Sequence, residues 1–316
     1  MWIAGENHDH EDMKRFLFQY IRSMRLYYGF VTGTTVLFGI WMAYNDGGAW
    51  GWREAVALVV GFLAWGVNQI FSDYCDRKED AVNAPHRPMV TGALAAWPAM
   101  VLSAVVMLLF AAVSLLMTPW SLLALCIGGV LNVAYSLLKR VPVLNVMVYA
   151  CAITCCALYG FAVTSGKFPS PLFVTAIAMM VVPVHALMCH NSYYKDVTGD
   201  RAAGVRTLQT LFPENISLIV TVVAAICIIL YSLYVVFQWN SFAATVQAAV
   251  ELTLTAMLLV SLEKRCYHRA TCLNCQLCVS MIYAWMLVDR SWPLLPEIAS
   301  LIIIHLLFLW YRDEKE

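Results

Sequence analysis

Long hydrophobic spans dominate this chain and limit it to a small set of folds. Of its 316 residues, 61% are hydrophobic and only 13% are charged, whereas soluble domains average about 25% charged residues. Each span holds about 18 to 25 residues, enough for a helix to cross a bilayer core of roughly 30 Å. The expected spans are residues 25–43, 54–72, 93–117, 119–138, 143–164, 171–192, 214–238, 241–262, 271–289 and 293–311. The sequence therefore predicts an all-α protein, a polytopic transmembrane bundle of nine or ten helices.

Basic residues indicate how these helices are oriented. With the N-terminus in the cytoplasm, 17 of the 20 Lys and Arg residues fall on the cytoplasmic side, and only Arg53, Lys167 and Arg290 fall outside. The formal net charge is zero, so a polyanionic partner such as nucleic acid is not expected. We expect a multi-pass integral membrane protein surrounded by the lipid bilayer.

The two ends of the chain give further expectations about topology. Residues 1–24 lack the early apolar core of a cleavable signal peptide, and residues 11–24 are amphipathic and basic. They predict an amphipathic helix at the membrane interface, followed by one transmembrane domain over residues 25–316 with two pseudo-repeated halves. Residues 293–311 either cross the bilayer, which makes ten spans, or lie along its surface, and we expect ten.

Two clusters of aspartates occupy matching positions in the two halves. Asp73, Asp76 and Asp80 follow the second span, and Asp196 and Asp200 follow the sixth. Within each cluster two aspartates lie four residues apart, so on a helical turn their carboxylates share one face. Carboxylates this close stay ionised only beside a compensating charge, most simply a metal cation. Both clusters fall on the expected cytoplasmic side, so they predict a cytoplasmic cap over a central cavity.

A cap of this kind suits a lipid-soluble substrate with an anionic head group. Mg²⁺ prefers oxygen ligands and commonly joins one or two carboxylates to substrate phosphates. Two or three such ions would hold one isoprenyl diphosphate and stabilise the departing diphosphate. The allylic carbocation that remains needs a dry pocket with aromatic faces, and the chain has 14 Phe, 15 Tyr and 11 Trp residues.

Three polar motifs follow one another along the chain. The first is Ser72-Asp73-x-x-Asp76-x-x-x-Asp80-x-x-Asn83-x-x-x-Arg87-Pro88, and the last is Lys195-Asp196-x-x-x-Asp200-Arg201-x-x-Gly204-x-Arg206-Thr207-Leu208. Between them stands Tyr135-Ser136-x-x-Lys139-Arg140-x-Pro142. In sequence and order these motifs resemble those of the UbiA superfamily of intramembrane prenyltransferases. The resemblance covers roughly residues 15–289 and implies Mg²⁺-dependent transfer of a prenyl group from its diphosphate to an aromatic or lipid acceptor.

The resemblance also implies a role for each matching residue. The expected metal ligands are Asp73, Asp76, Asp80, Asp196, Asp200 and, one helical turn before Ser72, Asn68. The catalytic residues among them are expected to be Asp76, Asp80, Asp196 and Asp200. The expected diphosphate contacts are Arg87, Lys139, Arg140, Lys195 and Arg22, with Arg25 as an alternative to Arg22. Candidates for the pocket wall are Ser72, Asn83, Asn145, His190, Asn191 and Tyr194.

Two departures from the family pattern keep other functions open. Ser72 stands where the family usually has Asn, and Asn191, Ser192 and Tyr193 precede the second aspartate motif where a further acid is often found. Both concern the second substrate, so a terpene cyclase on the same scaffold, which needs no acceptor, is the alternative. A transporter is a third interpretation, but its acids should interrupt spans at mid-membrane, whereas these lie at span ends. Prenyl chain length, acceptor identity and oligomeric state are not readable from the sequence.

Overall fold

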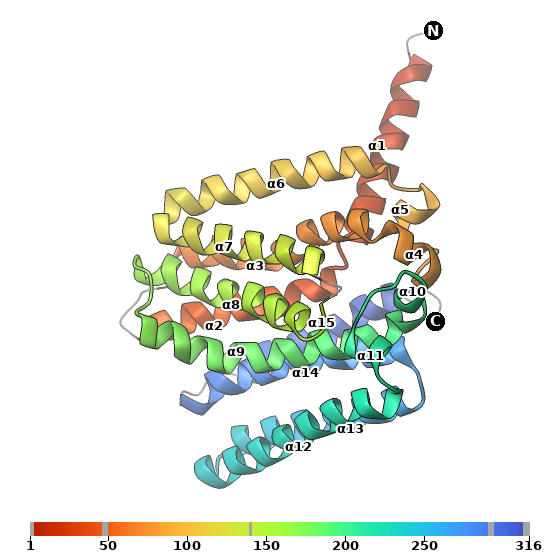
Figure 1. Cartoon of the computed structure of the whole chain (residues 1–316). Helices are drawn as coiled ribbons and strands as arrows, with labels where there is room; N and C mark the ends of the chain where they lie inside the picture. The colour runs from red at the N-terminus through yellow and green to blue at the C-terminus, as the bar shows by residue number, and fades with distance from the viewer. Residues whose placement is uncertain (1–2, 46–49, 139–140, 290–293, 312–316) are drawn as a thin grey trace.

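The computed structural model describes residues 3–45, 50–138, 141–289 and 294–311, which are almost entirely helical. Apart from the first helix, ten long helices of this part of the chain form a bundle (Figure 1). They are α2 (Gly29–Asn45), α3 (Trp52–Cys75), α6 (Ala96–Met117), α7 (Pro119–Leu138), α8 (Leu144–Ser165), α9 (Pro171–Ser192), α12 (Glu214–Trp239), α13 (Phe242–Glu263), α14 (Tyr267–Asp289) and α15 (Leu294–Trp310). No strand occurs among the described residues, and the predicted all-α class is confirmed.

Eight of the long helices are apolar enough to cross a membrane. These candidate spans are Leu26–Tyr44, Trp52–Cys75, Ala96–Met117, Pro119–Leu138, Leu144–Ser165, Pro171–Ala202, Glu214–Trp239 and Phe242–Glu263. α14 is long but polar, with buried Thr271, Asn274, Gln276 and Ser280, and it packs against α2, α9, α13 and α15. A helix enclosed by other helices can satisfy polar side chains by interhelical hydrogen bonds, so α14 does not need an apolar surface.

α15, the shorter apolar helix, runs back to the end of the bundle where α2 begins. Tyr311, which is fully buried, places its hydroxyl 3.3 Å from the carbonyl oxygen of Ile21 and 3.4 Å from the backbone nitrogen of Leu26. Near the start of α15, Glu297 accepts a hydrogen bond from Ser280 in the second half of α14. α15 therefore runs along the bundle, and its crossing of the membrane as a tenth span stays a prediction.

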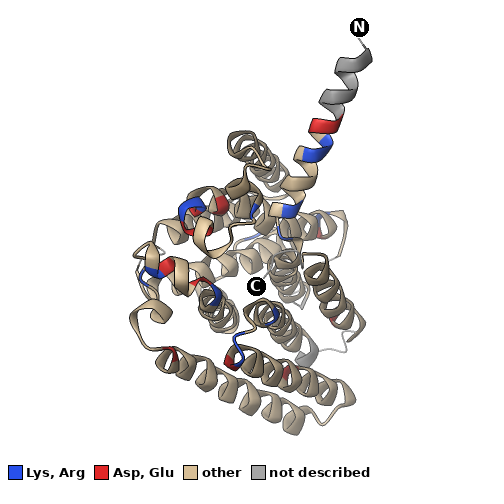
Figure 2. Ribbon diagram, turned by 90° about the vertical axis from the view of Figure 1, so that its right-hand side faces the viewer, with Lys and Arg blue, Asp and Glu red and all other residues tan. Residues whose placement is uncertain are grey.

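Short helices gather at the end of the bundle to which α15 returns (Figure 1). They are α4 (Arg77–Asn83), α5 (Pro88–Thr91), η2 (Tyr193–Asp196), α10 (Val197–Ala202) and α11 (Leu208–Leu211). Figure 2 looks onto this end and shows both acidic and basic residues there. The expected polar cap is therefore present over one end of the bundle, while its cytoplasmic location stays a prediction.

Helices α2 and α8 touch backbone to backbone at the centre of the bundle. A Cβ added to Gly39 would lie 1.9 Å from the carbonyl oxygen of Ala157, and one added to Gly160 would lie 2.2 Å from that of Val36. Glycine is required at both positions because any side chain would force the helices apart. This crossing fixes two walls of the cavity described below.

Helix α1 (Ile3–Ser23) extends away from the bundle at the polar end and runs across the direction of the long helices (Figures 1 and 2). It continues into a short 3₁₀ turn, η1 (Leu26–Tyr28). Its exposed apolar side chains are Met13, Leu17, Phe18 and Ile21. The structure agrees with an amphipathic helix, and its placement at the membrane interface stays a prediction.

Candidate active site

A cavity begins beneath the short helices and extends between α2, α3, α6, α7, α8 and α9. Its mouth is polar and is lined by Arg25, Asn68, Gln69, Ser72, Asp76, Asp80, Asn83, Arg87, Ser192, Lys195 and Asp196. Its far end is lined by Val36, Val60, Gly61, Met107, Ala124, Leu125 and Tyr159. The cavity is therefore built for an elongated molecule with a charged head and an apolar tail.

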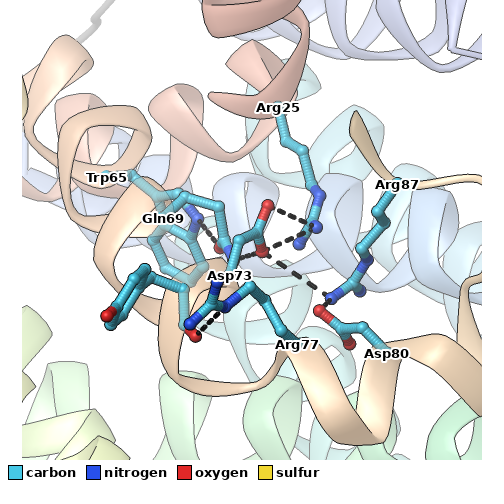
Figure 3. A network of polar contacts seen from close by, with 8 residues as sticks. Arg25, Trp65, Gln69, Asp73, Arg77, Asp80 and Arg87 are labelled. Carbon is cyan, nitrogen blue, oxygen red and sulfur yellow. Dashed lines mark hydrogen bonds and ion pairs between the residues drawn. The ribbon is translucent and has the colours of Figure 1, made fainter. Parts of the chain in front are cut away.

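Buried ion pairs hold the first acidic segment, residues 73–87, in place (Figure 3). Asp73 accepts two hydrogen bonds from one guanidinium nitrogen of Arg25, at 2.9 and 3.2 Å, and another from Gln69 at 2.8 Å. Arg87 lies 3.6 Å from Asp73 and forms a second ion pair with Asp80. Arg25 is 7% exposed and Arg87 11%, so these pairs are largely shielded from solvent. The two arginines neutralise part of the acidic charge before any cation binds.

Asp80 lines the cavity and is chemically unusual. Burial raises the pKa of its carboxyl to about 6, although Arg87 opposes the shift and Asp73 adds to it. Desolvation disfavours the charged form of this carboxyl. A cation beside Asp80 would favour the charged form, so it would lower that pKa and keep the carboxylate ionised. Asp80 is thus placed to respond to a positive ion in the cavity mouth.

The second acidic segment, residues 195–206, approaches the same mouth from η2 and α10. Lys195 and Asp196 are half-buried and line the cavity, whereas Asp200 is completely buried. The side-chain oxygen of Asn83, in α4, accepts a 2.7 Å hydrogen bond from the backbone nitrogen of Gly199 in α10. This bond joins the two acidic segments across the cavity mouth.

The residues at the mouth fit Mg²⁺. Asp76, Asp80 and Asp196 line one cavity, together with Asn68 and Ser72, whose side chains carry oxygen atoms. Within the described part of the chain, no three His, Cys, Asp or Glu side chains lie close enough to hold a metal ion by themselves. Mg²⁺ commonly takes one or two carboxylates and completes its octahedron with water and phosphate oxygens, so a closed protein cage is not needed.

Aromatic side chains from separate helices form one wall of the cavity. Trp65 stacks on Tyr28 at 4.7 Å and meets Tyr149 edge to face at 5.7 Å. Tyr135 lies 5.4 Å from Tyr149, and its hydroxyl is 3.1 Å from that of Tyr193. Sequence reasoning counted aromatic residues without finding this row, because no local spacing connects positions on η1, α3, α7 and α8.

Several predicted residues are absent from the lining of the cavity, and their predicted roles stay predictions. Asp73, a predicted metal ligand, contacts Arg25, Gln69 and Arg87 in this structure. Asn145 stands behind the wall and donates a 3.1 Å hydrogen bond to the Tyr193 hydroxyl. Of the alternatives Arg22 and Arg25, it is Arg25 that lines the cavity.

The pocket candidates His190, Asn191 and Tyr194 belong to a separate polar network. His190 contacts the carbonyl oxygen of Ser217 at 3.2 Å, and Ser217 donates to the Tyr194 hydroxyl at 3.1 Å. Asn191 accepts from Thr221 at 2.7 Å and donates to Asn274 at 3.2 Å. These bonds join α9 to α12 and α14, away from the cavity. Lys139 and Arg140 lie outside the described residues.

Comparisons with known proteins agree with this fold and motif order. The model of the UbiA prenyltransferase family matches residues 33–271. Digeranylgeranylglyceryl phosphate synthase of Natronomonas pharaonis is 33% identical over 168 residues, 52% of this chain and 59% of that protein. The bacteriochlorophyll synthase 33 kDa chain of Cereibacter sphaeroides is 30% identical over 230 residues, 71% of this chain and 74% of that protein. The aligned region thus spans less than two thirds of the first relative.

Solved structures share the helical arrangement at low sequence identity. A UbiA homologue from Aeropyrum pernix superposes with a TM-score of 0.63 at 15% identity, covering 86% of this chain and 98% of that one. A UbiA homologue from Archaeoglobus fulgidus, solved with GPP and Mg²⁺ bound, gives 0.59 at 16% identity, covering 94% and 99%. The bundle and its acid-rimmed cavity therefore define an intramembrane protein of known fold. The chain belongs to the UbiA prenyltransferase family.

Proposed function

We propose that this chain is a Mg²⁺-dependent prenyltransferase that ionises an isoprenyl diphosphate and transfers the prenyl group to an acceptor. The observation that carries this proposal is the mouth of the cavity, where Asp76, Asp80 and Asp196 meet Arg87 and Lys195 above an apolar chamber. The names of the aligned relatives, and the GPP and Mg²⁺ bound by a homologue of the same fold, support it.

The residues of the mouth would bind the head group. Asp76, Asp80 and Asp196 would hold two or three Mg²⁺ ions, with Asn68 as a further oxygen ligand. Bound Mg²⁺ would neutralise charge that develops on the leaving diphosphate. Arg87 and Lys195 add positive charge at the same rim, where the surrounding protein excludes water and strengthens electrostatic attraction.

The chamber below would receive the positive charge left on the prenyl group. The rings of Tyr28, Trp65 and Tyr149 lie next to one another along the wall, and aromatic rings attract a cation through their quadrupoles. The lining beyond them is apolar, so water is kept from the reactive carbon. The allylic carbocation would then react with the nucleophile of an aromatic or lipid acceptor that enters beside it.

The location of the site follows from charge asymmetry along the chain. The polar end carries most of the Lys and Arg residues of the sequence, and such residues favour the cytoplasmic side. We therefore place the cap on the cytoplasmic face of an integral multi-pass protein, with α1 at the membrane interface.

The decisive experiment incubates purified protein with geranyl or geranylgeranyl diphosphate and Mg²⁺, with and without a lipid extract. A transferase should hydrolyse the diphosphate slowly by itself and should turn over faster with its acceptor, giving a product heavier by the prenyl group. A cyclic hydrocarbon from diphosphate and Mg²⁺ alone would instead establish the terpene cyclase. Absence of diphosphate release under every condition would disprove the proposed function.

A further inference from the structure

Helix α7 brings one amide side chain to the wall of the cavity, below the charged mouth. The residues of α7 that line the cavity are Ala124, Leu125, Gly128, Gly129, Asn132 and Tyr135. Their spacing places them on one side of the helix, because each residue turns the helix by about 100°. Four of the six are small or aliphatic and one is aromatic, so Asn132 interrupts a wall that is otherwise apolar.

The side chain of Asn132 lacks a hydrogen-bond partner within the protein. Its Nδ2 atom is buried and finds no partner among the described residues. Asp80 is the other described lining residue with such an atom, and its carboxylate pairs with Arg87. Thr32, which also lines the cavity, donates to a backbone carbonyl oxygen at 3.3 Å. A buried amide without a partner costs free energy, so Asn132 is suited to a polar group of a bound molecule.

Asn132 lies at the depth where the reacting carbon is expected. Tyr135, one helical turn nearer the mouth, has its hydroxyl 3.1 Å from that of Tyr193, which stands two residues before Lys195 of the mouth. Three residues of helix rise by about 4.5 Å, so Asn132 lies just inside the mouth. The allylic carbon of a prenyl diphosphate is bonded to a diphosphate oxygen, so it also lies just inside the head group.

The wall next to Asn132 leaves room for a second molecule. A Cβ added to Gly129, one turn further into the chamber, would meet no atom within 4 Å. By contrast, a Cβ added to Gly61, which also lines the cavity, would lie 2.5 Å from a methyl carbon of Val36. A prenyl tail has no polar atom to offer an amide, so a cavity filled by the donor alone would leave Asn132 unpaired below the head group.

We propose that Asn132 binds a hydroxyl group of the acceptor and so positions the nucleophile beside the allylic carbon. This inference rests on the proposed function and deepens it, because it names the acceptor class as a lipid with a free hydroxyl. An amide and a hydroxyl can each donate and accept, so the pair is satisfied in either orientation of the amide. In the transfer, the allylic carbon–oxygen bond breaks with its electron pair going to the diphosphate. The nucleophilic atom of the acceptor forms the new bond to carbon, and the proton that it carried passes to the released diphosphate.

The test compares transfer with hydrolysis in the full-length protein, with geranylgeranyl diphosphate, Mg²⁺ and a lipid extract as probes. The extract is used untreated and after acetylation, which caps its hydroxyl groups, and only the untreated extract should yield prenylated lipid. Asn132→Leu should lower the ratio of prenylated lipid to prenyl alcohol at least about tenfold, and should leave diphosphate release without extract within about twofold. Asn132→Ser retains a hydroxyl and should give an intermediate ratio. Asn215→Leu, the same change at an exposed position of α12 outside the lining, is the matched control and should change neither quantity.

The outcomes separate this inference from the proposed function. Wild-type protein that releases no diphosphate, or that makes a cyclic hydrocarbon, would refute the proposed function itself. Wild-type protein that releases diphosphate but forms prenylated lipid equally from both extracts, or from neither, would refute only the hydroxyl acceptor. An unchanged ratio in Asn132→Leu, or an equal loss of transfer and of hydrolysis, would refute the role of Asn132. Diphosphate release without extract shows in the same assay that the variant is folded.

Discussion

The two acidic segments look alike in sequence but are built differently. In the first, Arg25 and Arg87 are buried and pair with Asp73 and Asp80. In the second, Arg201 and Arg206 are exposed, and the half-buried Lys195 lines the cavity. Among the described residues, the two segments thus share the spacing of their aspartates but differ in the burial of their arginines.

Because of this difference, the carboxylates at the cavity mouth are expected to contribute differently to stability and to activity. The first segment is a preformed network whose carboxylates are fixed by arginine before substrate arrives. Asp196 faces the cavity, where the charge of buried Arg87 also acts on it, while Asp200 lies deeper. We expect substitutions at Asp73 and Asp80, which pair with arginine, to affect stability and activity together, and those at Asp76 and Asp196 to affect mainly activity.

The largest effect is expected from removing a carboxylate that faces the mouth. Asp76→Asn or Asp196→Asn should lower Mg²⁺-dependent diphosphate release about thousandfold, equivalent to about 4 kcal/mol of transition-state stabilisation. The melting temperature should stay close to that of the wild type. Glu214→Gln, at a partly exposed acid outside the cavity lining, is the control and should leave the rate unchanged. Retention of more than about a tenth of the activity in either Asp variant would contradict the assignment.

The next effect concerns the buried network itself. Arg25→Ala leaves Asp73 buried without its closest cation and should cost about 3 kcal/mol of unfolding free energy. The control is Arg265→Ala, which breaks an exposed ion pair with Glu214 and should cost less than about 1 kcal/mol. Chemical denaturation in detergent measures both. Equal losses in the two variants would show that the network adds no stability, and the contrast between the segments would fail.

The extent of the helices was predictable because hydrophobic length depends only on local sequence. The expected spans differ from the observed helices by a few residues at their ends; the ninth, 271–289, corresponds to α14 (Tyr267–Asp289). The polarity of α14 follows from its enclosure by four neighbours, which no local pattern reports. In the same way, the ion pair between Arg25 and Asp73 joins positions 48 residues apart and depends on tertiary packing.

The pocket wall was predicted less well for a geometrical reason. Met188, Cys189 and Ser192 of α9 line the cavity, so the intervening His190 and Asn191 must point elsewhere, because each residue turns the helix by about 100°. His190 and Asn191 were chosen because they are close in sequence to the second motif, but they lie on a face of α9 that does not line the cavity. Asp76, Asp80, Asp196, Asn68, Ser72, Asn83, Arg87 and Lys195 were placed at the cavity as expected, because they lie at the helix ends that form its rim.

A smaller effect is expected where the two segments touch. A Cβ at Gly199 would lie 2.4 Å from the side chain of Asn83, so Gly199→Ala should cost about 2 kcal/mol of unfolding free energy. Asn83→Ala removes the 2.7 Å hydrogen bond and should cost about 1 kcal/mol. Because both changes act on one contact, the double variant should lose less than the sum of the single losses. Strict additivity in denaturant titrations would mean that the segments are not coupled.

The smallest effect separates a cation at the cavity from one outside it. Lys195 lines the mouth, whereas Lys78 is exposed on α4 and lies outside the cavity lining, although the two belong to corresponding segments. Lys195→Met should raise KM for geranyl diphosphate about tenfold, or about 1.4 kcal/mol, through loss of a charge that faces the diphosphate. Lys78→Met removes the same charge near the same rim but should change KM less than twofold, because solvent screens exposed charges. Equal increases in KM would mean that the net charge of the rim attracts the substrate, and Lys195 would then have no contact of its own with the head group.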